Sequence, residues 1–155
     1  MSSSTPETAQ TVSAYFTVRN AAAALDFYAR AFGAEEIYRL TDTTGRIGHA
    51  EMRIGNSVMM LSDEHPDFGA LAPPTVGGSP VKFHITIDDA DAFMAQAVAA
   101  GATVLRPLEN QFYGMRSGMV ADPFGHSWFI AAPLEDVSPE EMQRRYSKAL
   151  EGETA

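Results

Sequence analysis

The chain has no cysteine in its 155 residues, and none of its apolar runs approaches the roughly 20 residues that a membrane-spanning helix needs. The lack of cysteine excludes disulfides, thiolate metal ligands and a cysteine nucleophile. Positive charge is also scarce, since 11 Lys and Arg face 20 Asp and Glu, which gives a net charge of −9. Because such an acidic chain repels phosphate groups, we expect no nucleic acid as a partner, and the short apolar runs predict no membrane span.

The sequence also lacks a glycine-rich phosphate loop, a nucleophile elbow and a His-Glu zinc motif, so nucleotide-dependent chemistry is not indicated. The first 11 residues, MSSSTPETAQT, have neither the basic nor the apolar region of a secretory signal. We expect residues 1–11 to form a disordered tail and the protein to be cytoplasmic. With 45% hydrophobic and 20% charged residues, the composition is typical of a soluble globular protein.

A faint internal repeat is the main pattern that the sequence does contain. Residues 15–33, YFTVRNAAAALDFYARAFG, and residues 83–101, FHITIDDADAFMAQAVAAG, both read as a strand, a polar cap, an alanine-rich helix and a glycine. Asn20 suits the first helix N-cap, and Asp88 or Asp89 suits the second. Three more strand-like runs follow each helix, at 36–41, 47–54 and 57–61 and at 103–108, 115–120 and 127–131.

Each half is therefore predicted to be a β-α-β-β-β module, and the fold class is α+β. The modules, at 12–64 and 80–134, are joined by a proline- and glycine-rich linker at 65–79. We expect them to form one domain, 12–134, because about 60 residues rarely bury enough surface alone. Region 135–155 is predicted to hold a C-terminal helix and tail, which begin with the capping box of Ser138 and Glu141.

Alternation along the strands separates two faces of each predicted sheet. In HAEMRI, the apolar Ala50, Met52 and Ile54 alternate with polar residues, and the apolar set should lie under a helix. The polar set then faces a pocket or, as the alternative, simply water. Across both modules this polar set is Tyr15, Thr17, His49, Glu51, Arg53, Lys82, His84 and Thr86.

The segment YGMRSGMVADPFGHSW, residues 113–128, divides into two parts. Its first part belongs to a candidate recognition loop, in which aromatic side chains can stack on a flat ligand and a guanidinium can hold an anion. This loop consists of Gln111, Phe112, Tyr113 and Arg116. In the second part, Asp122 and Gly125 are predicted to shape a turn, His126 to be solvated at a rim, and Trp128 to pack in the core.

The motifs VRNAAAALDFYARAFGAEE, GHAEMRIGNSVMMLSDE and ADPFGHSWFIA give the chain a family resemblance. It resembles the vicinal oxygen chelate superfamily, which includes glyoxalase I, bleomycin-binding resistance proteins, fosfomycin-inactivating enzymes and extradiol dioxygenases, and most of all its PhnB-like branch. The resemblance implies two modules whose strands form a curled mixed sheet with a cleft. We also expect a homodimer.

The resemblance implies four metal-ligand positions, one on the first, fourth, fifth and eighth strands. Here they fall on Ser13, near Met59, on Lys82 and on Phe129, which are poor ligands for a divalent ion. We therefore expect no cofactor and no metal at the usual site. A displaced divalent metal site formed by His49, Glu51 and His84 is the alternative.

Three functions remain open from the sequence. The first is a small-molecule-binding protein of the bleomycin-resistance type, which takes an organic ligand or drug without the usual metal. Its ligand-binding residues would be Tyr15, Arg53, His84, Gln111, Phe112, Tyr113, Arg116 and Phe129. The second is a glyoxalase-related lyase or isomerase that uses His49 and Glu51, with Glu51 as a base if its surroundings raise its pKa. An interaction module built on the C-terminal helix is a third option.

Overall fold

A computed structural model describes residues 9–153 of the chain, so part of the tail predicted at residues 1–11 lies outside the described range. The elements follow the predicted β-α-β-β-β order twice, and the fold class is α+β. In chain order they are β1 (Tyr15–Val18), α1 (Ala21–Phe32), β2 (Glu35–Thr41), β3 (Ile47–Ile54), β4 (Ser57–Asp63), η1 (Pro66–Phe68), α2 (Pro73–Val76), β5 (Lys82–Thr86), α3 (Ala90–Ala100), β6 (Thr103–Asn110), β7 (Met115–Ala121), β8 (Ser127–Pro133) and α4 (Pro139–Glu153).

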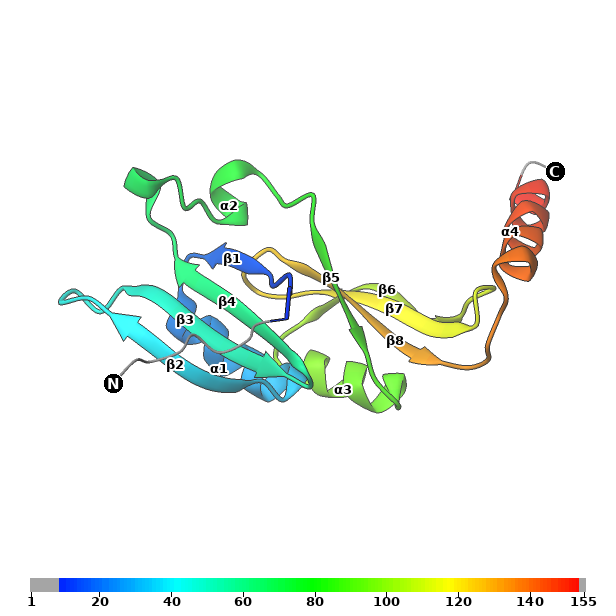
Figure 1. The fold of residues 1–155 in the computed structure, drawn as a ribbon, viewed down its shortest axis with the longest axis horizontal. Helices are drawn as coiled ribbons and strands as arrows, with labels where there is room; N and C mark the ends of the chain where they lie inside the picture. The colour runs from blue at the N-terminus through cyan, green and yellow to red at the C-terminus, as the bar shows by residue number, and fades with distance from the viewer. Residues whose placement is uncertain (1–8, 154–155) are drawn as a thin grey trace.

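Each module forms its own four-stranded sheet, in the orders β1-β4-β3-β2 and β5-β8-β7-β6. In both sheets the first strand runs parallel to the fourth and the remaining pairs are antiparallel, so both sheets are mixed. Figure 1 shows the N-terminal sheet on the left, with α1 behind it, and the C-terminal sheet on the right, and hydrogen bonds of Arg30 and Gln96 join α1 to α3. The predicted mixed sheet is formed as one four-stranded sheet per module, because β1 and β5 each pair only with the last strand of their own module.

The predicted caps fix where the two main helices begin. The side chain of Asn20 accepts a hydrogen bond from the backbone N–H of Ala23, and Asp89 does the same for Ala92. Asp89 rather than Asp88 is therefore the second cap. After α1, Gly33 adopts a left-handed conformation with φ of 71°, which closes the helix with hydrogen bonds to its last carbonyls.

The core lies where the two helices meet the helix-facing sides of both sheets. Trp128 of β8 is 1% exposed and packs against Phe32 and Tyr28 of α1 and against Phe83 of β5. A buried ring of this size removes roughly 150–250 Å² from water, so the contact of Trp128 with α1 helps to hold the two modules together. The predicted core position of Trp128 is confirmed.

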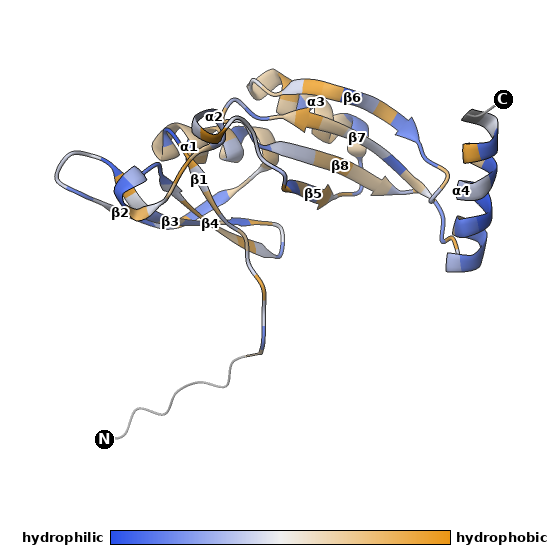
Figure 2. Ribbon diagram, turned by 90° about the horizontal axis from the view of Figure 1, so that it is seen from above, coloured by the Kyte–Doolittle hydropathy of each residue, from blue (hydrophilic) through white to orange (hydrophobic). Residues whose placement is uncertain are grey.

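The segment between the modules is more structured than a plain linker. It contains the short helices η1 and α2, and Pro73 of α2 packs against the β7–β8 turn at Gly125, where an added Cβ would lie 2.7 Å from the proline ring. The C-terminal helix α4 stands at the far end of the molecule (Figure 1), and its surface is largely hydrophilic (Figure 2). Its predicted cap is confirmed, since Ser138 accepts a hydrogen bond from the N–H of Glu141.

Candidate functional site

A chain of hydrogen bonds joins four side chains on the polar face of the N-terminal sheet. The Tyr15 hydroxyl lies 2.9 Å from Nδ1 of His49, and Nε2 of His49 lies 2.8 Å from Oε2 of Glu51. The Tyr38 hydroxyl donates to the same Glu51 oxygen at 2.9 Å. Cross-strand register explains the cluster, because Tyr15, Met60, Glu51 and Tyr38 are successive partners across β1, β4, β3 and β2.

The Glu51 carboxylate determines which nitrogen of His49 carries the hydrogen. An ionised Glu51 only accepts, so Nε2 of His49 carries a hydrogen and Nδ1 of the neutral ring accepts from Tyr15. The hydrogen bonds from His49 and Tyr38 lower the pKa of Glu51, and the bond to Glu51 raises the pKa of Tyr38. Glu51 therefore orients His49, and its lowered pKa is the opposite of the raised pKa that a Glu51 general base would need.

The remaining predicted polar residues lie apart from this cluster. Arg53 is exposed on β3, two residues beyond Glu51 on the same face. His84 is exposed on β5 of the other sheet, where its ring centre is 6.0 Å from that of Phe129. Within residues 9–153, no group of three or more His, Asp or Glu side chains is placed to hold a metal ion. His49, Glu51 and His84 are thus not brought together within the chain.

The positions that correspond to the usual metal ligands do not fit a divalent ion. Met59 is 8% exposed and pairs with the buried Met52 on the helix-facing side, so Met60 is the residue of β4 that shares the polar face. Lys82 and Phe129, on β5 and β8, carry an ammonium and a hydrocarbon ring. None of these groups is a ligand that a hard cation prefers.

A second cluster lies on the polar face of the C-terminal sheet. Three predicted ligand-binding residues, Gln111, Tyr113 and Phe129, line one cavity of about 360 Å³ together with Arg106 and Glu109. Register again explains the grouping, because Phe129 pairs with Met119, which pairs with Arg106. The cavity thus combines aromatic surfaces with an amide, a guanidinium and a carboxylate, the groups that recognise a small polar aromatic molecule.

The other two residues of the predicted recognition loop point elsewhere. Phe112 packs its ring 5.7 Å from that of Tyr146 on α4, and its carbonyl accepts a hydrogen bond from Arg145. Arg116 faces α3, where Nε and one terminal nitrogen donate to Asp91 at 2.8 and 2.9 Å, and the other terminal nitrogen donates to the side-chain oxygen of Asn110 at 3.1 Å.

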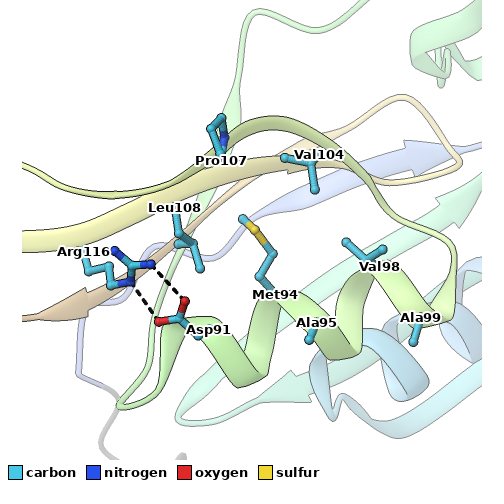
Figure 3. A pocket seen from close by; sticks show the side chains of 9 residues that line it. All are labelled: Asp91, Met94, Ala95, Val98, Ala99, Val104, Pro107, Leu108 and Arg116. Atoms are coloured by element: carbon cyan, nitrogen blue, oxygen red, sulfur yellow. Dashed lines mark hydrogen bonds and ion pairs between the residues drawn. The ribbon is translucent and has the colours of Figure 1, made fainter.

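This ion pair closes one end of an apolar groove between α3 and β6, of about 600 Å³ (Figure 3). Arg116 alternates with Ser117 along β7, and it is Ser117 that lines the cavity of Phe129. Phe112 and Arg116 of the predicted recognition loop therefore contact α4 and α3 of the fold itself.

Sequence reasoning missed Tyr38, Arg106 and Glu109. The strands β2 and β6 that carry them are largely exposed along their length and lack a clean apolar alternation. Both strands also contain irregular register shifts, between Glu36 and Tyr38 and between Arg106 and Glu109, so counting by two along the chain fails there. Only the pairing with β3 and β7 reveals which face these residues occupy.

Comparison with known proteins places this arrangement in a family. Residues 10–130 match the family model of the Glyoxalase/Bleomycin resistance protein/Dioxygenase superfamily. An uncharacterised protein of Mycobacterium bovis is 40% identical over 144 residues, which cover 91% of this chain and 95% of the relative.

Two solved structures are similar in fold. A gene product of Arabidopsis thaliana has a TM-score of 0.65 at 28% identity and covers 80% of this chain and 99% of its own. The fosfomycin resistance protein FosX of Listeria monocytogenes, solved with Mn(II) and sulfate, has a TM-score of 0.64 at 17% identity and covers 90% and 99%. The family match, the sequence relative and the shared fold agree, and the chain belongs to the Glyoxalase/Bleomycin resistance protein/Dioxygenase superfamily.

Proposed function

We propose that the protein binds a small organic molecule against the polar face of its C-terminal sheet and does so without the metal site usual in the superfamily. The cavity lined by Gln111, Tyr113 and Phe129 supports this proposal. Its volume of about 360 Å³ suits a small organic molecule. The Phe129 and Tyr113 rings would stack on a planar ligand, and Arg106 and Glu109 would bind its polar groups. The drug-resistance role in the name of FosX makes antibiotics reasonable first ligands.

A thermal-shift screen of planar aromatic antibiotics and small 2-oxo compounds tests this proposal. We expect at least one compound to raise the unfolding temperature, since ligands that bind only the folded state stabilise it. Phe129→Ala should abolish that increase, whereas Tyr146→Ala, which alters a half-exposed ring on α4, should retain it. If no compound stabilises the protein, or if Phe129→Ala leaves the increase unchanged, the proposed cavity is not the binding site.

Elemental analysis of protein purified without chelator or affinity tag tests the metal-free part of the proposal. We expect no transition metal at stoichiometric amounts. A stoichiometric metal that disappears in His49→Ala would instead support the displaced site of His49, Glu51 and a histidine such as His84. In such a site the second histidine would have to come from another copy of the chain, because within one chain His84 lies on the other sheet, apart from His49 and Glu51.

The hydrogen-bonded chain of Tyr15, His49, Glu51 and Tyr38 favours proton transfer as a second candidate function. Tyr15 is 52% exposed, so its hydroxyl can meet a substrate, and His49 behind it can accept the phenolic proton while Glu51 stabilises the charge. This arrangement suits a lyase or isomerase that removes a proton from a carbon next to a carbonyl group.

Exchange of that proton with D₂O, followed by NMR on 2-oxo compounds, measures the reaction directly. We expect Tyr15→Phe to slow exchange by roughly 10²–10⁴-fold, the usual contribution of a positioned acid or base. Tyr38→Phe should have a much smaller effect, because His49 still holds Glu51. Exchange no faster than in buffer for every compound would leave ligand binding as the only proposed function.

The exposed outer strands support a homodimer. All seven residues of β2 are exposed, including Ile37, Tyr38 and Leu40, and β6 is almost as open. Exposed apolar side chains at a sheet edge are usually covered by another chain. Light scattering after size exclusion should give twice the mass of 16.7 kDa, and Leu40→Lys should shift the protein towards the monomer. A mass of one chain for the unaltered protein would contradict this assignment.

A further inference from the structure

A third cavity, of about 380 Å³, lies at the junction of the two modules, where it shares Tyr15 with the hydrogen-bonded cluster of the N-terminal sheet. Its walls come from the edge of β1, from β5 and from the segment between the modules. The residues on which its chemistry depends are Tyr15, Thr17, Pro73, Val76, Phe83 and His126. Residues 65–79 were expected to be only a linker, yet five of them line the cavity, and Pro80 and Val81 at the start of the second module extend this wall.

The intermodular segment is held in place from both modules. Glu64 at the end of the N-terminal module accepts a hydrogen bond from the N–H of Ala72 at 2.9 Å, and Arg19 donates to the Thr75 hydroxyl at 3.2 Å. From the C-terminal module, Gly125 packs against Pro73. The cavity wall is therefore a fixed part of the fold rather than a loop that happens to lie nearby.

His126 is the one buried polar side chain among the residues that line this cavity, with 6% of its surface exposed. The sequence predicted a solvated histidine at a rim, and this prediction is wrong because the rings of Phe16 and Phe83 lie 5.0 and 5.7 Å from the imidazole.

Nε2 of His126 is 3.0 Å from the carbonyl oxygen of Thr17. Since a carbonyl only accepts, Nε2 carries the hydrogen, and Nδ1 of the neutral ring is an acceptor. In the described part of the chain, no hydrogen bond to Nδ1 is present, and this nitrogen is not among the fully enclosed unbonded atoms. An acceptor thus remains available beside an apolar cavity.

We propose that this junction cavity is a second ligand site, which takes a small, neutral and mostly apolar molecule that carries one hydroxyl or N–H group. The donor group would bind Nδ1 of His126, and the apolar remainder would pack against Phe83, Val76 and the prolines. The lining contains no Asp, Glu, Lys or Arg, so a charged ligand would lose its hydration without compensation. The cavity volume is in the range of small-ligand sites, roughly 300–1,000 Å³.

Two probes of similar shape, cyclohexanol and methylcyclohexane, test the role of the acceptor. Histidine-labelled protein is titrated with each probe while the ring signals of His126 are followed by NMR. We expect a saturable shift with both probes and roughly three- to tenfold tighter binding of cyclohexanol, which is the usual net effect of one neutral hydrogen bond. Equal affinities, or no saturable shift of the His126 signals, would overturn the proposal.

Two variants make the test specific. His126→Phe keeps a ring but removes the acceptor, so the preference for cyclohexanol, read from Trp128 fluorescence, should disappear. Because this change also leaves the Thr17 carbonyl without its donor and can impair folding, Val76→Trp provides a second variant that narrows the cavity from a 58% exposed position. Val76→Trp should weaken the binding of both probes at least tenfold. Val104→Trp, at a 43% exposed position outside the cavity, should leave their binding unchanged. Unchanged binding in Val76→Trp would contradict the assigned site.

Discussion

Asp122 accepts four hydrogen bonds while it is only 5% exposed, so its removal should be among the most destabilising single changes in the chain. One carboxylate oxygen accepts the backbone N–H groups of Phe124 and His126 at 2.8 and 3.0 Å. The other accepts the Tyr28 hydroxyl at 2.6 Å and the Trp128 indole N–H at 2.9 Å. Asp122→Ala would leave all four donors without an acceptor.

Asp42 provides a matched control within the same chain. It occupies the corresponding turn of the β2–β3 hairpin, and its carboxylate accepts the backbone N–H groups of Thr44 and Arg46 at 2.8 and 3.0 Å. Both turns end in a glycine with a similar backbone angle, φ of 90° at Gly45 and 95° at Gly125. The two turn bonds are therefore common to both sites, and Asp42 itself is exposed to solvent.

The difference between the two alanine variants mainly reflects the bonds to Tyr28 and Trp128, because the further bond that Asp42 accepts, from the Thr44 hydroxyl, is exposed to water. Each buried donor that loses its acceptor costs about 1–3 kcal/mol, so Asp122→Ala should lower the free energy of unfolding by about 2–6 kcal/mol more than Asp42→Ala. Asp42→Ala alone should cost about 1 kcal/mol, since water replaces the exposed carboxylate.

Urea unfolding followed by far-UV circular dichroism measures both variants, and the slope against urea must be the same for the comparison to hold. Dichroism is needed beside fluorescence because the mutation itself changes the surroundings of Trp128, the only tryptophan. A difference below about 1 kcal/mol would refute the reasoning, because it would show that water or a rearranged side chain satisfies both donors.

Three further predictions concern backbone strain and titration. Gly114→Ala should lower the free energy of unfolding by about 1–3 kcal/mol, because φ is 85° and the new Cβ would lie 2.5 Å from the Glu135 carbonyl oxygen. Gly48→Ala is the control: open space surrounds this glycine, so the urea midpoint should change little. The hydrogen bonds that Glu51 accepts lower its pKa from 4.5, so the ionised carboxylate stabilises the fold above that pH. The free energy of unfolding should therefore be higher for the unaltered protein than for Glu51→Gln at pH 7, and this difference should shrink as pH falls below 4.5. A difference that is constant with pH would contradict the assigned bonds. Burial, and then the charge of Asp122, raises the pKa of Tyr28 well above 10, so alkaline titration by ultraviolet absorbance should show one of the five tyrosines ionising only when the fold is lost at high pH.

Local patterns predicted most of the fold. The caps at Asn20 and Asp89, the turn at Asp122 and the alternation in HAEMRI depend on neighbours within a few residues, so they can be recognised along the chain. The same alternation placed His49 and Glu51 on one face, and the structure joins them at 2.8 Å. Whether either residue acts on a ligand is still a prediction.

The site itself depended on contacts that a single strand does not encode. Arg116 is one residue from Ser117, yet only the packing of α3 over β7 shows that its side chain binds Asp91 instead of lining the cavity of Phe129. Tyr38 donates a hydrogen bond to Glu51 because a register shift in β2 places its side chain on the polar face. Arg116 and Tyr38 thus show that reading along one strand cannot assign a face where pairing is irregular.

Sequence alone determined that this chain forms two β-α-β-β-β modules with an apolar and a polar face on each sheet, because the alternation of side chains along a strand and the capping of a helix depend only on residues close together in the chain. Only the tertiary structure decided that the modules keep separate sheets, that His126 is buried between Phe16 and Phe83, and that residues 71–81 wall a cavity. These features join His126 to Thr17, 109 positions earlier in the chain, and the packing of such distant segments is fixed by the shape and burial of the whole core.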